Sequence, residues 1–331
     1  MAHPPRAAVI GCGLYLPDKV LTNADLERMV DTSDEWITTR TGIKERRVAA
    51  PEQAASDLAL PASLHALEEA GLEPADLDCI IAATMTPDMI FPSTACYLQG
   101  ALGAMPCAAF DLLAACSGYI YALAVARAMI VSGQYRNVLI VATEALTKIT
   151  DYTDRRSCIL FGDGAGATVV CAAEPDARGE VLYVTLGADG SNGGSMTLPA
   201  GGSRLPASHA TVDARYHFIN LRGREVFQLA VRKIVEVVTQ CLEACELSHD
   251  DVALLVPHQM NLRIMQASAS RLDIPMDKVF VNIDRYGNTG AATVPIALHE
   301  AHEQGRVQRG DIVILVTFGG GLSWSGAVLR W

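Results

Sequence analysis

Short apolar runs alternate with longer amphipathic segments along most of the chain. Runs of apolar and β-branched residues between polar or glycine-rich turns predict buried strands. We expect strands at residues 7–12, 77–84, 107–111, 138–143, 168–172 and 252–256. Apolar residues at helical spacing predict helices at residues 53–71, 93–102, 221–245 and 262–272. This alternation predicts an α/β protein.

Two parts of the first half of the chain recur in the second half. The stretch E-E-A-G-L-E-P-A-D-L-D-C-I-I-A-A from Glu68 is echoed by E-A-C-E-L-S-H-D-D-V-A-L-L-V-P from Glu243. Likewise, G-Q-Y-R-N-V-L-I-V-A-T from Gly133 is echoed by G-R-V-Q-R-G-D-I-V-I-L-V-T from Gly305, and both echoes have an offset of roughly 175 residues. A shared offset is typical of a duplicated unit. We therefore expect two similar α/β halves, residues 1–174 and 175–331, each with a central sheet covered by helices.

Composition and charge exclude several classes of protein. Half of the 331 residues are hydrophobic, and a net charge of −11 without a basic stripe argues against nucleic-acid binding. The N-terminal M-A-H-P-P-R has no signal-peptide core and no apolar run is long enough to cross a bilayer, so we expect no membrane partner. Nine cysteines without a C-x-x-C pair favour a reducing, cytoplasmic location. The eight histidines lack ligand partners at suitable spacing, so we expect no metal.

Two basic segments stand out in this acidic chain. Residues 32–47 contain one tryptophan and several basic side chains, which predict a surface that binds a ligand. The helix expected at residues 221–245 begins with Arg222 and Arg224, a candidate docking patch for an acidic partner. The alternative for this helix is a solvated face without a binding role.

Cys116 lies where the strand at residues 107–111 turns into a helix that begins at Ser117 and ends at Gly133. Unpaired N–H groups and the helix dipole favour a negative charge there, so we expect this thiol to ionise easily. A thiolate is a good acyl acceptor. The alternative is a buried small residue without a chemical role, which is common for free cysteines.

Two further residues favour a chemical role for Cys116. His258 follows the strand at residues 252–256, at the carboxyl edge where α/β proteins place reactive groups, and Asn288 lies in the loop R-Y-G-N-T-G-A-A. In a cysteine hydrolase the histidine would take the thiol proton, whereas in a condensing enzyme the histidine and asparagine act on the second substrate. The hydrolase signature C-G-S-C-W is absent, because Cys116 is followed by S-G-Y.

Six motifs extend from Asp31 to Trp324: D-T-S-D-E-W-I-T-T-R-T-G-I, A-A-C-S-G, F-G-D-G-A-G-A, V-P-H-Q-M-N-L-R-I, G-N-T-G-A-A-T-V-P and F-G-G-G-L-S-W. With these motifs the chain resembles β-ketoacyl-acyl-carrier-protein synthase III, the initiating condensing enzyme of type II fatty acid synthesis in the thiolase superfamily. The resemblance covers nearly the whole chain. It implies a thiolase-like fold with two duplicated halves in an α-β-α-β-α layering, and a homodimer.

The resemblance implies a ping-pong condensation without a resident cofactor. Cys116 would take the acyl group from an acyl-CoA, with the oxyanion held by the N–H groups of Cys116 and Gly320. His258 and Asn288 would then stabilise the enolate formed when malonyl-acyl carrier protein loses CO2. Asparagine suits this role because it is a neutral donor, whereas an aspartate would place a negative charge beside the enolate.

The resemblance also assigns binding residues. It implies a CoA site at Thr32, Trp36, Arg40, Arg155, Gly223 and Asn261, carrier-protein docking at Arg263, Arg224 and Arg271, and an acyl pocket at Phe91, Leu221 and Phe318. Phe91 would reach across the dimer. The chain departs from the family at Arg156, where a small residue is common, and at Gln228 and Ser270, where some members have basic residues. These departures concern the CoA loop and the docking patch.

Two alternatives to condensation stay open. An enzyme of secondary metabolism with the same fold could pass the acyl group to an oxygen or nitrogen nucleophile without loss of CO2, although His258 and Asn288 favour condensation. A non-catalytic carrier-binding protein would need an idle thiol, and alkylation of Cys116 well below about pH 8 would argue against it. Acetyl, branched short and longer acyl primers are all compatible with the sequence.

Overall fold

The computed structural model describes residues 6–173, 177–221 and 223–331, with the backbone alone for residues 223–226. Among the described residues, nine strands form one mixed sheet with the order β11-β12-β13-β8-β1-β7-β6-β4-β5. These strands are β1 (Arg6–Tyr15), β4 (Cys79–Ala83), β5 (Ala108–Leu112), β6 (Asn137–Ala145), β7 (Asp163–Ala173), β8 (Glu180–Ala188), β11 (Val252–Pro257), β12 (Ile312–Gly319) and β13 (Ser323–Arg330). Every strand predicted from the apolar runs is present.

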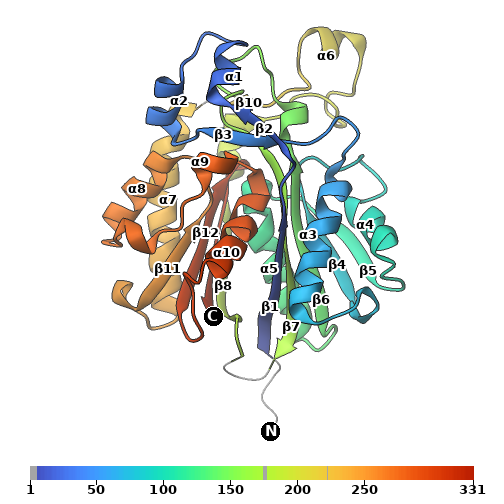
Figure 1. The fold of residues 1–331 in the computed structure, drawn as a ribbon, viewed down its shortest axis with the longest axis vertical. Coiled ribbons are helices and arrows are strands. Elements are labelled where there is room, and N and C mark those ends of the chain that lie inside the picture. Colours follow the sequence, from blue (N-terminus) through green and yellow to red (C-terminus); the bar gives the residue numbers. More distant parts are fainter. Residues whose placement is uncertain (1–5, 174–176, 222) are drawn as a thin grey trace.

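The helices that cover this sheet are α3 (Ala55–Ala70), α4 (Thr94–Leu102), α5 (Gly118–Val131), α7 (Gly223–Ala244), α8 (Leu262–Arg271) and α10 (Thr293–Glu303). Helices α3 and α4 pack against strands of the first half, and α7 and α8 against strands of the second half. Between the halves lie α5 and α10, whose apolar side chains form one buried cluster with strands of both (Figure 1). This is the predicted α-β-α-β-α layering of a thiolase-like fold.

The two halves of the sheet share a four-strand topology, to which the first half adds β5 at its outer edge. From the middle outward, the first half runs β1-β7-β6-β4 and the second runs β8-β13-β12-β11. In each half the first three strands are antiparallel and the last pair is parallel. β4 and β11, which begin at Cys79 and Val252, match the offset of roughly 175 residues between the sequence echoes. The boundary that we predict between residues 174 and 175 falls outside the described residues.

The remaining strands and α-helices of the described residues are short. They are β2 (Lys19–Thr22), α1 (Asn23–Glu27), α2 (Asp34–Thr41), β3 (Glu45–Val48), β9 (Met196–Thr197), α6 (His209–Asp213), β10 (Asn220–Leu221) and α9 (Ile283–Tyr286).

Segment 32–47, which the sequence predicts to be a surface, also reaches into the interior. Arg46 is fully buried and donates hydrogen bonds to the carbonyl oxygens of Leu21 and Ile159, at 3.2 and 2.6 Å. This arginine joins segments that are distant in the sequence.

Within the described ranges, no helix combines the length and apolarity that a membrane span requires. All nine cysteines lie in the described part of the chain and are free thiols. Nor do the described residues include a group of three or more histidine, cysteine, aspartate or glutamate side chains that could hold a metal ion.

Candidate active site

Cys116 lies on a single turn of 3-10 helix, Ala115–Ser117, between β5 and α5. The turn is tight, because Ala115 has a φ of 48°, a left-handed conformation that is uncommon for residues other than glycine. The side chain of Cys116 is buried, with 2% of the residue exposed. The predicted position at a strand-to-helix junction is confirmed.

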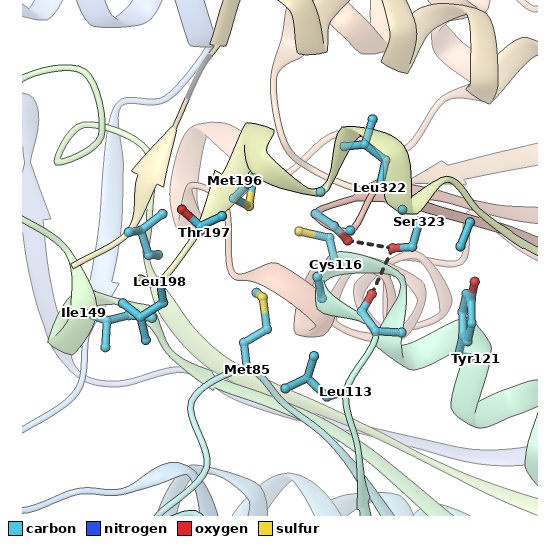
Figure 2. Close-up of a pocket in the computed structure, with 18 of the residues that line it drawn as sticks. Met85, Leu113, Cys116, Tyr121, Ile149, Met196, Thr197, Leu198, Leu322 and Ser323 are labelled. Atoms are coloured by element: carbon cyan, nitrogen blue, oxygen red, sulfur yellow. Dashed lines mark hydrogen bonds between the residues drawn. The ribbon is translucent and has the colours of Figure 1, made fainter. Parts of the chain in front are cut away.

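The loop after β12 lies against Cys116. A Cβ atom on Gly319 would come within 2.8 Å of the Cys116 Cβ, so only glycine allows this approach. The backbone N–H of the next residue, Gly320, favours a negative charge on the Cys116 sulfur and so lowers its pKa. The Ser323 hydroxyl lies 3.0 Å from the carbonyl oxygen of Gly320 and 3.1 Å from that of Ala114 (Figure 2). These contacts fix the Gly320 N–H beside the thiol.

His258 follows the end of β11 and is almost fully buried. Its backbone N–H donates to the carbonyl oxygen of Val316 at 2.8 Å, and its Nδ1 lies 2.5 Å from the Thr293 hydroxyl. Its Nε2 is buried without a hydrogen-bond partner among the described residues. Burial lowers the pKa of His258 to about 3, so the ring is neutral at pH 7. The site thus holds a neutral imidazole with one nitrogen left for a ligand.

Asn288 lies in the loop between α9 and α10. Its backbone N–H donates to the carbonyl oxygen of Leu160 at 2.8 Å, and its side-chain oxygen accepts a hydrogen bond from the N–H of Gly290 at 2.9 Å. Because the amide oxygen is engaged in this way, the amide nitrogen is the group left to donate. Asn288 lines one small pocket together with Cys116, His258, Gly320 and Phe318. The predicted residues therefore meet although they come from both halves of the chain.

The ionisation of Cys116 differs from the prediction. Burial raises the pKa of Cys116 to about 12, and the nearby Glu144 carboxyl contributes to the increase. The N–H groups of Gly320 and Cys116 oppose this effect but do not outweigh it. The helix N-terminus alone suggested an easily ionised thiol. In the closed pocket the resting thiol is protonated at neutral pH.

A second, larger cavity of about 560 Å³ opens on the other side of Cys116. Its lining is mainly apolar and includes Met85, Leu113, Ile149, Met196, Leu198 and Leu322. Ile149 and Leu198 lie at one end and Tyr121 at the other, with Cys116 between them (Figure 2). The cavity can accept an apolar chain attached to the sulfur.

The residues predicted for the acyl pocket do not line this larger cavity. Phe318 lies in the smaller pocket with His258 and Asn288. Leu221 is half-buried in β10, and Phe91 is 81% exposed on the surface. The lining comes instead largely from loops and short elements, including the glycine- and serine-rich stretch after β8 that contains Met196 and Leu198. The sequence offered one signal for this lining, namely the apolar residues Met196 and Leu198 inside an otherwise polar stretch.

The predicted CoA residues gather at one surface. The guanidinium groups of Arg40 and Arg155 lie 4.8 and 4.6 Å from the centre of the Trp36 ring. Asn261 begins α8 and donates to the carbonyl oxygen of Arg40 at 3.0 Å. The Thr32 hydroxyl is buried without a hydrogen-bond partner among the described residues. The predicted CoA residues whose side chains are described thus form a cluster around the indole ring of Trp36. Gly223 lies in the stretch that is described by its backbone alone.

The predicted docking arginines are only partly described. Arg263 and Arg271 are exposed on α8, and the Arg263 guanidinium lies 5.7 Å from the centre of the Phe227 ring. The side chain of Arg224 lies outside the described residues. Arg156, which departs from the family, forms an ion pair with Asp154 at 2.8 Å. The exposed arginines on α8 leave a positive face in an acidic protein.

The thiol, the neutral imidazole, the amide and the two N–H groups define an acyltransferase of the thiolase type. Comparisons with known proteins agree. Residues 110–190 match the model of the 3-oxoacyl-[acyl-carrier-protein (ACP)] synthase III family, and residues 242–331 match the model of its C-terminal part. A β-ketoacyl-[acyl-carrier-protein] synthase III of Caldanaerobacter subterraneus subsp. tengcongensis is 54% identical over 331 residues, which cover 100% of this chain and 99% of that protein.

Solved structures give the same result. The 3-oxoacyl-[acyl-carrier-protein] synthase III of Aquifex aeolicus has 48% sequence identity and a TM-score of 0.90, covering 98% of this chain and 100% of that chain. The enzyme of Pseudomonas aeruginosa has 38% identity and a TM-score of 0.91, with 98% of each chain covered. The chain belongs to the β-ketoacyl-acyl-carrier-protein synthase III family, the condensing enzymes that initiate fatty acid synthesis.

Proposed function

We propose that this chain joins an acyl-CoA primer to the malonyl group of malonyl-acyl carrier protein, with loss of CO2 and through an acyl-Cys116 intermediate. The observation that carries the proposal is the single buried pocket that Cys116, His258, Asn288 and Gly320 share. Each of these residues has a reactive or hydrogen-bonding group available there. The proposed reaction uses these groups alone and needs no resident metal or cofactor.

In the first half-reaction, the Cys116 sulfur attacks the thioester carbonyl of acyl-CoA. A C–S bond forms to Cys116, the bond to the CoA sulfur breaks, and the thiol proton passes to the departing CoA thiolate. The N–H groups of Gly320 and Cys116, which favour a negative charge on the sulfur in the free enzyme, stabilise the oxyanion. The apolar cavity beside Cys116 receives the acyl chain. Because burial raises the pKa of the resting thiol, Cys116 loses its proton during the attack and not before it.

In the second half-reaction, the carbonyl oxygen of the malonyl thioester accepts hydrogen bonds from His258 and Asn288. His258 can donate from Nε2 when Thr293 donates its hydroxyl proton to Nδ1 across the 2.5 Å contact. The C–C bond to the carboxylate breaks, CO2 leaves, and the resulting enolate carbon attacks the acyl-Cys116 carbonyl. The C–S bond then breaks, which releases the 3-oxoacyl product and returns the sulfur to its thiol form on protonation. Both donors are neutral, so they stabilise the enolate without taking up its charge.

Two surfaces fit the two substrates. An adenine ring can stack against the Trp36 ring and the guanidinium of Arg155, which already lie together. The exposed Arg263 and Arg271 can meet acidic side chains of a carrier protein. The proposed substrates are cytoplasmic molecules, in line with the predicted location.

We also propose a homodimer that forms along β5, the last strand of the sheet. Large apolar side chains near this strand are mostly exposed: Ile90, Phe91, Met105 and Leu113. Leu113 also lines the larger cavity, so a second copy placed here would complete the cavity wall. In solution the chain is expected to have twice its monomer mass by light scattering. A Phe91→Ala variant tests whether that residue closes the pocket of its partner, because the variant should then accept longer primers.

Intact-mass spectrometry of the carrier protein tests the proposed reaction. After incubation with acetyl-CoA and malonyl-carrier protein, the wild type should give acetoacetyl-carrier protein. Cys116→Ala should give none, whereas Cys241→Ala, a buried cysteine in α7, should behave as the wild type. If Cys116 becomes acetylated while the malonyl-carrier protein stays intact, the condensation proposal is wrong.

A further inference from the structure

Glu144 is a fully buried carboxyl group that the reaction outlined above does not use. It lies near the end of β6, beyond the apolar run 138–142 of that strand. Burial raises the pKa of Glu144 to about 8, and Asp163 adds to this increase. Hydrogen bonds from neighbouring groups lower the pKa again but do not offset the burial. A buried carboxyl group is costly unless it has a role or good partners.

The carboxyl group of Glu144 holds two loops together. Its Oε2 accepts a hydrogen bond from the Thr86 hydroxyl at 2.8 Å, and both of its oxygens lie 3.2 Å from the N–H of Met85. The N–H of Ala291 donates to its Oε1 in a longer contact of 3.5 Å. Met85 lines the larger cavity, and Ala291 follows Asn288 by three residues. Glu144 thus joins the wall of the acyl cavity to the turn after Asn288.

Gly290 transmits the position of Glu144 to Asn288. Its N–H holds the side-chain oxygen of Asn288 at 2.9 Å. Gly290 has a φ of 58°, and a Cβ atom there would lie 3.1 Å from Oε1 of Glu144 and 3.1 Å from Cε of Met85. This close packing leaves little freedom for the turn. A change of shape or charge at residue 144 should therefore displace the amide of Asn288.

We propose that Glu144 is a positioning residue for the decarboxylation step, acting on the malonyl thioester through Gly290 and Asn288. The inference rests on the proposed function, because it concerns the same pocket. Glu144 itself need not touch the substrate. Its removal should slow the release of CO2 much more than the acylation of Cys116, which depends on Gly320 and the sulfur.

The protonation state of Glu144 provides a specific signature. Among the described residues, the titratable groups that interact with it are Cys116 and Asp163, whereas Met85, Thr86, Gly290 and Ala291 do not titrate. A negative charge on Glu144 disfavours a thiolate at Cys116 and a developing enolate nearby. The neutral form is therefore the active one. Activity should fall as Glu144 loses its proton above pH 8 or so.

The test compares Glu144→Gln, Glu144→Ala and wild-type enzyme between pH 6 and pH 10. Two rates are measured: CO2 release from malonyl-carrier protein, and acetylation of Cys116 by acetyl-CoA, followed by intact mass. Glu144→Gln keeps the shape without the charge, so its CO2 release should equal that of the wild type at pH 7 and exceed it increasingly above pH 8. In Glu144→Ala the rate of CO2 release should fall about 10-fold to 100-fold, which is the effect expected when a reacting group is misplaced. The rate of Cys116 acetylation should change little.

Glu69→Gln is the matched control. Glu69 is a half-buried carboxyl that accepts a hydrogen bond from the N–H of Cys12 at 2.6 Å, and it does not line either pocket. This variant should have the wild-type rates of CO2 release and acetylation, and its activity should fall above pH 8 as that of the wild type does. An unchanged alkaline loss in Glu144→Gln, or an equal fall of both rates in Glu144→Ala, would overturn the positioning role. A wild-type enzyme that releases no CO2 would instead overturn the proposed function, and this inference with it.

Discussion

The two sides of Cys116 are built in different ways. On the catalytic side, His258, Asn288 and Gly320 lie at or just beyond the ends of regular elements and are held by hydrogen bonds from the backbone and from hydroxyl groups. On the acyl side, loop residues such as Met85, Ile149 and Leu198 form an apolar wall. The chemical step needs donors placed within a fraction of an ångström, whereas an acyl chain needs only space and apolar contact. Changes on the catalytic side should therefore be costly, and those on the acyl side should adjust specificity.

The largest effect is expected for Asn288→Asp. A carboxylate in place of the amide would repel the enolate, so condensation at pH 7 should fall about 10³-fold. Acetylation of Cys116 should continue at the wild-type rate, as intact mass can show. Asn220→Asp, an exposed change in β10, is the control and should leave both steps unchanged. Retention of CO2 release by Asn288→Asp would remove Asn288 from the proposed role.

Gly319→Ala should give a somewhat smaller effect on both half-reactions. The added Cβ would lie 2.8 Å from the Cβ and 2.9 Å from the N of Cys116, so the loop must move and carry the Gly320 N–H with it. Acetylation and condensation should both fall about 10²-fold, as for the loss of one oxyanion donor. Gly100→Ala in α4 is the control, because an added Cβ meets no atom there within 4 Å. Equal activity of the two variants would show that the loop position is unimportant.

The catalytic side should also make stability sensitive to acid. His258 has a pKa of about 3 in the folded protein and near 6.5 when unfolded, so the unfolded chain gains the proton first as the pH falls. The free energy of unfolding should therefore drop by about 2 kcal/mol between pH 7 and pH 5 from this group alone. Urea unfolding of wild type and His258→Asn at both pH values measures the difference. An identical pH dependence in the two proteins would contradict the neutral buried imidazole.

The smallest effect is expected on the acyl side. Leu198→Ala enlarges the end of the cavity, so the preference for hexanoyl-CoA over acetyl-CoA, as kcat/KM, should rise by about 10-fold or less. Thermal stability should change little, because Leu198 is already 43% exposed. Val212→Ala on α6, a mostly exposed residue outside the cavity lining, should leave the preference unchanged. A loss of turnover with every primer would mean that the two sides of Cys116 are coupled.

The sequence predicted the regular elements well where local signals were strong. The helix predicted over residues 93–102 is α4, where Ser93 accepts a hydrogen bond from the N–H of Cys96, and the helix predicted over residues 53–71 is α3, which Gly71 follows in a left-handed conformation. Segment 32–47 was harder, because the charge of Arg46 suggested exposure. Its guanidinium is buried against carbonyl oxygens from segments more than 20 residues away in the sequence. No local signal indicates such partners.

For the site, the sequence by itself determined which residues are candidates for the reaction. Cys116, His258 and Asn288 are marked by their motifs, since Cys116 and His258 follow predicted strands and Asn288 lies in a glycine-flanked loop. Only the tertiary structure decided how they behave. The pKa values of Cys116 and His258 follow from burial, and the roles that we propose for Glu144 and Thr293 follow from contacts between distant segments. Motifs record local geometry, but ionisation and the shape of a cavity depend on everything that packs around them.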